Sequence, residues 1–179
     1  MRQLIICAGL LVVPTASSFA QEASQSVYRN DARLTRLRVF FQDAHSPLLR
    51  LAEDFLAAAD LQGLDWRLLP SISMVETGCG RTAVGNNIFG WDSGRKRFVS
   101  FREAIQRVAS RLGQSKLYRG KDLSHVLATY NSRPQYAALV KSVMTQLGPA
   151  EPSKARLATE ARLSPVPSLP GIGRPGQVQ

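Results

Sequence analysis

One carboxylate is set apart by the residues around it. Glu76 follows Leu69 and Ile72 at the spacing i, i+3, i+7, which places it on the apolar stripe of a predicted helix. Gly78 supplies the left-handed residue that ends such a helix. The carboxyl then lies at the negative end of the helix dipole among apolar neighbours, and both effects disfavour its ionised form. A carboxyl of this kind suits a general acid, whereas the ordinary alternative is a solvated glutamate at a helix end.

The segment after this helix offers side chains that suit a carbohydrate ligand. Asn86 and Asn87 carry amides that can bond to sugar hydroxyl and N-acetyl groups, although either could simply hold a turn. Phe89 and Trp91 offer rings that could stack on a sugar, and their alternation places at least one of them in the core. We predict a substrate-binding role for all four residues.

Cleavage of a glycosidic bond needs a second group that stabilises or captures the sugar cation. Asp92 is the carboxylate that the non-helical segment offers, and its slightly favoured alternative is a plain turn aspartate. Tyr130 is the second candidate, because its hydroxyl can form a hydrogen bond while the ring packs on the core. A core tyrosine at a helix end is the alternative for Tyr130. The predicted catalytic set is Glu76, Tyr130 and Asp92.

Three motifs carry a resemblance to known cell-wall enzymes. Glu76-Thr-Gly-Cys-Gly80 followed by Asn86-Asn-Ile-Phe-Gly90 resembles the glucosaminidase family of peptidoglycan hydrolases (glycoside hydrolase family 73), within the lysozyme-like superfamily. Ala128-Thr-Tyr-Asn131 resembles a motif of the related soluble lytic transglycosylases. The likeness spans residues 48–147. It departs from the family at Cys79, where members often have an aromatic residue.

The resemblance implies both a fold and an activity. The expected fold is mainly α, a lysozyme-like helical domain over residues 28–147 with a small β-hairpin lobe beside the catalytic cleft. The expected enzyme is an endo-β-N-acetylglucosaminidase that cuts the glycan strands of peptidoglycan, with Glu76 as the acid and Tyr130 near the catalytic centre. A lytic transglycosylase stays an alternative, because attack by the sugar's own hydroxyl or by its 2-acetamido group needs no second carboxylate. A non-catalytic peptidoglycan-binding module is the alternative from another class.

The ends of the chain predict export. Residues 1–20 read as a secretory signal peptide, with Arg2 before an apolar run that is too short to span a bilayer and small residues before Ala20. The mature protein is therefore expected in the periplasm or outside the cell, with no stable membrane insertion. Residues 148–179 are rich in proline and are expected to be a disordered tail, either a spacer or a segment that binds an unknown protein partner.

The composition and charge of the chain limit the kinds of partner and cofactor that we expect it to bind. The net charge of +10 favours anionic partners, and for an exported protein these are cell-wall polymers rather than nucleic acid. His45 and His125 are isolated, so no metal site is predicted, and no phosphate loop or dinucleotide fingerprint indicates a cofactor. Cys79 has no evident base partner and is expected to be a buried thiol.

Apolar periodicity and capping residues predict the elements that position these side chains. Strands are expected at 88–91 and 96–99, on either side of a hairpin turn at Asp92-Ser-Gly94. The mixed pattern of residues 28–44 is compatible with a short amphipathic helix. One predicted helix begins after Ser46-Pro47 and ends at Gly63, and the next begins after Asp65 and ends at Gly78. Three more helices are predicted at 101–112, at 123–130 and from Pro134 to Leu147.

Overall fold

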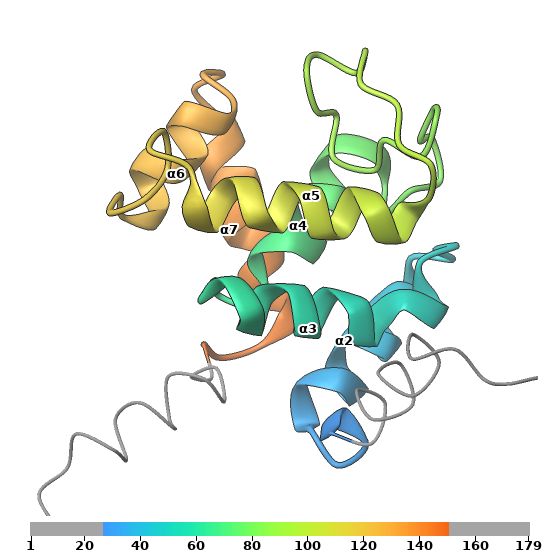
Figure 1. The fold of residues 1–179 in the computed structure, drawn as a ribbon. Helices are drawn as coiled ribbons and strands as arrows, with labels where there is room; N and C mark the ends of the chain where they lie inside the picture. The colour runs from blue at the N-terminus through green and yellow to red at the C-terminus, as the bar shows by residue number, and fades with distance from the viewer. Residues whose placement is uncertain (1–26, 151–179) are drawn as a thin grey trace, which may run out of the picture.

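The computed structural model describes residues 27–150, and this part of the chain is mainly α-helical (Figure 1). It contains six α-helices and one short 3-10 helix, which confirms the predicted fold class at that level. The predicted signal peptide at 1–20 and nearly all of the predicted tail at 148–179 lie outside the described residues. No helix of the described part is long and apolar enough to cross a membrane.

The first described helix, α2 (Ala32–Asp43), is anchored by a buried arginine. Asp31 caps the helix by accepting a hydrogen bond from the Arg33 N–H at 3.0 Å. The Arg33 guanidinium lies between Asp31 and Asp60, with ion-pair distances of 2.8 Å to both, and Tyr28 donates its hydroxyl proton to Asp60 at 3.0 Å. Every charge in this buried cluster has a partner, and the cluster joins the start of α2 to the helix that contains Asp60.

The helix predicted after Ser46 begins with one 3-10 turn, η1 (Leu49–Leu51), and continues as α3 (Ala52–Gln62). Ser46 accepts a hydrogen bond from the Leu48 N–H and donates its own proton to the Cys79 carbonyl at 2.7 Å. Gly63 ends α3 with φ +63, as predicted. The ring of Phe55 packs against Phe41 and Phe89 in the core, at centroid distances of 5.1 and 6.3 Å.

The helix that carries Glu76 is α4 (Leu68–Thr77), and most of its side chains are buried. It packs against α7 (Tyr136–Leu147), which is the last described helix. Gly78 ends α4 in the left-handed region, as the sequence predicted. Apolar residues on nearly all faces of α4 explain why it lies inside the molecule, with the other helices around it.

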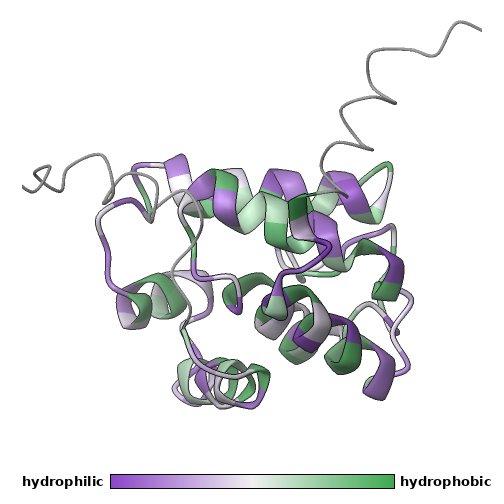
Figure 2. Ribbon diagram, turned by 90° about the horizontal axis from the view of Figure 1, so that it is seen from below, coloured by the Kyte–Doolittle hydropathy of each residue, from purple (hydrophilic) through white to green (hydrophobic). Residues whose placement is uncertain are grey.

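The helix α5 (Phe101–Gln114) confirms the strongest local signal in the sequence. Ser100 accepts a hydrogen bond from the Glu103 N–H, while the Glu103 carboxylate accepts one from the Val99 N–H at 2.7 Å. This arrangement is a capping box in which Glu103 binds the N–H of the residue before the N-cap, whereas the usual partner is the N–H of the N-cap residue itself. The apolar face of α5 packs on α3, and Figure 2 shows hydrophobic and hydrophilic residues interleaved along the helices. Helix α6 (Leu123–Tyr130) has the predicted bounds and packs on α7.

The predicted β-hairpin at 88–99 is wrong. No strand occurs within residues 27–150, and the segment from Arg81 to Ser100 consists of turns and irregular chain. Asp92, Ser93 and Gly94 all have positive φ, at +53, +53 and +78. Three such residues in succession coil the chain instead of reversing it between two extended strands. Backbone hydrogen bonds from Gly94 N to Gly90 O and from Arg95 N to Asp92 O close this coil, at 3.0 Å each.

Candidate functional site

Glu76 lies in the last turn of α4 and is partly exposed. Its carboxylate forms no ion pair within residues 27–150, and the Tyr136 hydroxyl lies close enough to act as its hydrogen-bond donor. The nearest backbone belongs to Gly90: a Cβ built on that residue would collide with Glu76 Oε2 and would lie 3.0 Å from Cδ. Only glycine therefore lets the irregular segment pack this closely over the carboxylate, and the φ of +60 at Gly90 suits glycine as well.

Two side chains from different helices hold the backbone just before Gly90. Thr77, the residue after Glu76, donates its hydroxyl proton to the Ile88 carbonyl at 2.8 Å and accepts a hydrogen bond from the Gly80 N–H at 3.0 Å. Tyr130, at the end of α6, donates its hydroxyl proton to the Phe89 carbonyl at 2.6 Å. The position of Gly90 over Glu76 is thus fixed from the α4 side and from the α6 side.

The two asparagines proposed as sugar ligands are occupied in turns. The Asn87 side chain is 3% exposed, and it donates to the Trp91 carbonyl and accepts from the Trp91 N–H, both at 2.9 Å. Asn86 donates its amide protons to the carbonyls of Phe98 and Val99, at 2.9 and 3.1 Å. Both residues therefore shape the segment around the site, which was the alternative that the sequence left open for them.

The two aromatic residues of this segment lie in different surroundings. Phe89 is fully buried and packs on Phe55, so its ring belongs to the core and has no free face for a sugar. Trp91 is partly exposed and meets the Tyr130 ring nearly edge to face, at a centroid distance of 5.5 Å and an interplanar angle of 66°. Trp91 is the aromatic residue of this pair that remains available for stacking.

Tyr136, at the start of α7, joins the site without having been predicted as part of it. Its ring stacks on Tyr130 at 5.9 Å and 7°. Its buried hydroxyl lies beside the Glu76 carboxylate. Burial, then the nearby Glu76 charge, raise the pKa of Tyr136 and of Tyr130, and a hydrogen bond to Glu76 adds to the rise for Tyr136. Both tyrosines therefore stay protonated, but the Tyr130 proton is used by the Phe89 carbonyl, so Tyr136 is the one of the two that can donate a hydrogen bond to Glu76.

Asp92 lies apart from this group, on an exposed turn. Its carboxylate forms an ion pair with Arg95 at 2.8 Å, and that hydrogen bond and charge lower its pKa. The lowered pKa keeps Asp92 ionised at neutral pH, as a nucleophile or a group that stabilises the sugar cation must be, but Arg95 already pairs with the exposed carboxylate. Its arrangement is that of a turn aspartate.

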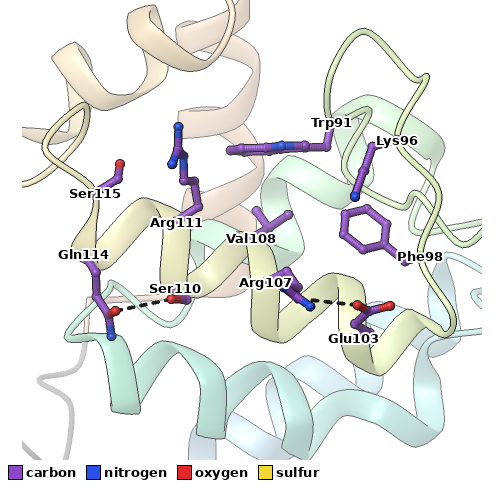
Figure 3. A pocket seen from close by; sticks show the side chains of 10 residues that line it. All are labelled: Trp91, Lys96, Phe98, Glu103, Arg107, Val108, Ser110, Arg111, Gln114 and Ser115. Carbon is purple, nitrogen blue, oxygen red and sulfur yellow. Dashed lines mark hydrogen bonds and ion pairs between the residues drawn. The ribbon is translucent and has the colours of Figure 1, made fainter.

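Residues of the irregular segment line two neighbouring pockets. The tyrosine pocket, of about 550 Å³, includes Gly90, Trp91, Tyr118 and Tyr130 in its lining. The basic pocket is also about 550 Å³ and is shown in Figure 3. Glu76 lines neither pocket, but it contacts Gly90 of the tyrosine pocket. The remaining lining of the tyrosine pocket is Asp92, Ser93 and Lys96, and the basic pocket is lined by Trp91, Lys96, Phe98, Glu103, Arg107, Val108, Ser110, Arg111, Gln114 and Ser115.

Cys79 and the histidines add no further chemistry to the site. Cys79 is fully buried, and burial raises the pKa of its thiol to about 11, which makes it a poor nucleophile at neutral pH. His125 is exposed and lies 2.7 Å from Asp122, the residue that caps α6. Within residues 27–150 no three His, Cys, Asp or Glu side chains gather as a metal site would require.

Comparisons with known proteins do not place the chain in a family. The three sequence motifs therefore remain a resemblance, and the functional argument depends on the geometry of Glu76, Gly90 and the two tyrosines. Searches against protein-family models, curated proteins and solved structures found no match to this chain.

Proposed function

We propose that this protein is an exported peptidoglycan hydrolase, an endo-β-N-acetylglucosaminidase that cuts β-1,4 bonds of cell-wall glycan strands with Glu76 as the general acid. One observation carries the proposal. The Glu76 carboxylate is partly exposed and forms no ion pair within residues 27–150, and it lies under Gly90 beside two protonated tyrosines, of which Tyr136 can act as its hydrogen-bond donor. A structural glutamate at a helix end normally pairs with a cation or is fully solvated.

Each side chain has a part in the proposed reaction. Glu76 protonates the oxygen of the leaving sugar, and its carboxylate then faces the positive charge that develops on the ring. The Tyr136 hydroxyl lies beside Glu76 and can donate a hydrogen bond to that carboxylate once Glu76 has given up its proton. The partly exposed Trp91 offers a face on which a sugar ring can stack.

A lytic transglycosylase is the second candidate, and a specific observation favours it. Asp92 is the carboxylate that lines the tyrosine pocket, and Arg95 engages it on the exposed side of its turn. A reaction with Glu76 as its one carboxylate can proceed when a hydroxyl of the substrate itself attacks the sugar carbon as the glycosidic bond breaks. The 1,6-anhydro product then lacks the water that hydrolysis adds, whereas attack by the 2-acetamido group gives a cyclic intermediate that water opens to the product of hydrolysis.

The test is to incubate the protein with purified peptidoglycan and to identify the released fragments by mass spectrometry. We expect fragments with reducing N-acetylglucosamine ends from the wild type and at least a 100-fold lower rate from Glu76→Gln, because loss of a general acid costs about 10²–10⁴-fold. Fragments with 1,6-anhydro ends would select the transglycosylase instead.

Asp92→Asn is the matched control, since it neutralises a different carboxylate, the exposed one in the lining of the tyrosine pocket. We expect it to retain most of the activity. Equal rates for Glu76→Gln and the wild type would refute the role of Glu76. Binding to peptidoglycan without release of any fragment by the wild type would make the protein a binding module.

A further inference from the structure

The basic pocket holds more positive charge than its own acid neutralises. Lys96, Arg107 and Arg111 line it, and Glu103 is the one acidic residue in its lining (Figure 3). Glu103 accepts a hydrogen bond from the Val99 N–H at 2.7 Å and pairs with Arg107 at 3.4 Å. Lys96 and Arg111 form no ion pair with any residue in the range 27–150, so two positive charges remain available to a ligand.

These two cations come from opposite walls of the basic pocket. Lys96 lies on the irregular segment with its ammonium 6.0 Å from the centre of the Phe98 ring, an arrangement that favours a cation. Arg111 projects from α5 (Figure 3). Burial raises the pKa of Tyr118 in the lining of the tyrosine pocket, and the Arg111 charge partly offsets that rise.

The basic pocket continues into the tyrosine pocket. Trp91 and Lys96 line both pockets, and the tyrosine pocket includes Gly90, which covers Glu76. Figure 3 shows the Trp91 side chain extending across the basic pocket above Val108. A ligand that stacks on Trp91 beside the tyrosines would therefore carry its substituents toward Lys96 and Arg111.

We propose that the basic pocket binds carboxylates of the peptide stems that peptidoglycan carries along its glycan strands, an inference that depends on the proposed function. An N-acetylglucosamine unit offers hydroxyl and acetamido groups, whereas a stem on the neighbouring sugar offers free carboxylates. A guanidinium matches a carboxylate with two parallel hydrogen bonds, and Lys96 adds a second positive charge. The pocket would then favour strands whose stems carry free carboxylates over strands whose stems are amidated.

The test compares three soluble tetrasaccharide probes on a Glu76→Gln background, which prevents turnover. One carries peptide stems with free carboxylates, one carries the same stems as methylamides, and one is a peptide-free N-acetylglucosamine oligomer. By titration calorimetry at low salt we expect the carboxylate probe to bind about fivefold more tightly than the methylamide probe, as two partly exposed ion pairs would give. Adding Lys96→Gln and Arg111→Gln together should remove this difference.

Arg29→Gln with Arg50→Gln is the matched control, because it removes the same charge from exposed positions outside both pockets and should keep the fivefold difference. Equal binding of the carboxylate and methylamide probes would overturn the proposal, as would an unchanged difference after Lys96→Gln and Arg111→Gln. Tighter binding of a phosphate-bearing wall polymer through the same two residues would make this a phosphate site and would also overturn it. These measurements need no cleavage, so they stay informative if the glucosaminidase activity is not found.

Discussion

At the residue scale, the irregular segment can approach Glu76 closely because Gly90 has no side chain. A Cβ there would collide with a carboxylate oxygen of Glu76, and the left-handed backbone adds a strain of about 1 kcal/mol for any other residue. We predict that Gly90→Ala displaces the carboxylate and lowers the rate of glycan cleavage at least tenfold. The measurement is fragment release together with a urea unfolding curve.

Gly94→Ala separates displacement of the carboxylate from backbone strain. Gly94 also has a left-handed backbone, with φ +78, but a Cβ at this position meets nothing within 4 Å. Both variants should lose similar stability, whereas only Gly90→Ala should lose activity. Equal activity losses in the two variants would show that the contact with Glu76 does not matter.

Residue identity alone predicted part of this site. The sequence pointed to Glu76 and Tyr130, and the structure brings both beside Gly90. Tyr136 fell within the last predicted helix without a predicted role in the site, because its approach to Glu76 depends on how α7 packs against α4. In the sequence, Lys96 and Arg111 cannot be told from ordinary surface charges, because the pocket that they share forms only when the segment between α4 and α5 folds against α5.

At the element scale, the segment between α4 and α5 is shaped by side-chain bonds to the backbone instead of by a strand ladder. Its alternation of apolar residues and its Asp-Ser-Gly turn are typical of a hairpin, which is why the sequence predicted one. Successive left-handed residues and the buried Asn87 produce a coiled turn instead. Such side-chain geometry has no periodicity that a sequence pattern can reveal.

We predict that Asn87→Ala loosens this segment. The substitution leaves the partly buried Trp91 N–H without its acceptor and removes one of the two donors to the Trp91 carbonyl, which keeps the Gly94 N–H at 3.2 Å, and the loss costs about 1–3 kcal/mol. Urea unfolding should show this loss, and the fluorescence of Trp91 should shift toward that of exposed tryptophan. Trp66 is fully buried and supplies an unchanged background.

Asn87→Asp is the matched variant, because it keeps an acceptor for the Trp91 N–H and loses only the donor. Its destabilisation should therefore fall between the wild type and Asn87→Ala. Wild-type stability and fluorescence in Asn87→Ala would contradict the role of this side chain.

At the scale of the whole molecule, several acidic groups are buried in their neutral forms. Burial raises the pKa of the Cys79 thiol from 9.0 to about 11, and the pKa values of Tyr28, Tyr118, Tyr130 and Tyr136 are raised as well. In the unfolded chain these groups lose their protons at lower pH than in the folded protein. The stability that they contribute is therefore fully present below pH 9 and is lost as the pH rises through the folded pKa values.

We predict that the free energy of unfolding decreases between pH 9 and about 11, with about 2–3 kcal/mol of the loss due to Cys79 alone. Urea unfolding at a series of pH values measures this decrease. In Cys79→Ala the decrease in stability should begin only near pH 10, where the tyrosines of the unfolded chain start to lose their protons. A stability that stays constant up to pH 11 would contradict the burial of these groups.

The helical architecture was largely predictable, because amphipathic periodicity and caps are local signals. Ser100 and Glu103 marked the start of α5, and the bounds of α6 were those predicted. The buried Arg33 was not predicted, since an arginine reads as a surface residue until Asp31 and Asp60 are brought to it. The 3-10 turn before α3 also depends on a distant contact, the hydrogen bond from Ser46 to Cys79.

The bond between Arg67 and the end of α7 determines where the chain leaves the described region. Arg67 donates a hydrogen bond to the Gly148 carbonyl at 2.8 Å, so the chain after Gly148 departs from the first turn of α4. Glu76 lies near the other end of that ten-residue helix, about 15 Å away. A chain that ends at Gly148 is therefore suited to attachment there to a solid support or to a fusion partner while the face that carries Glu76 stays accessible to large, insoluble material.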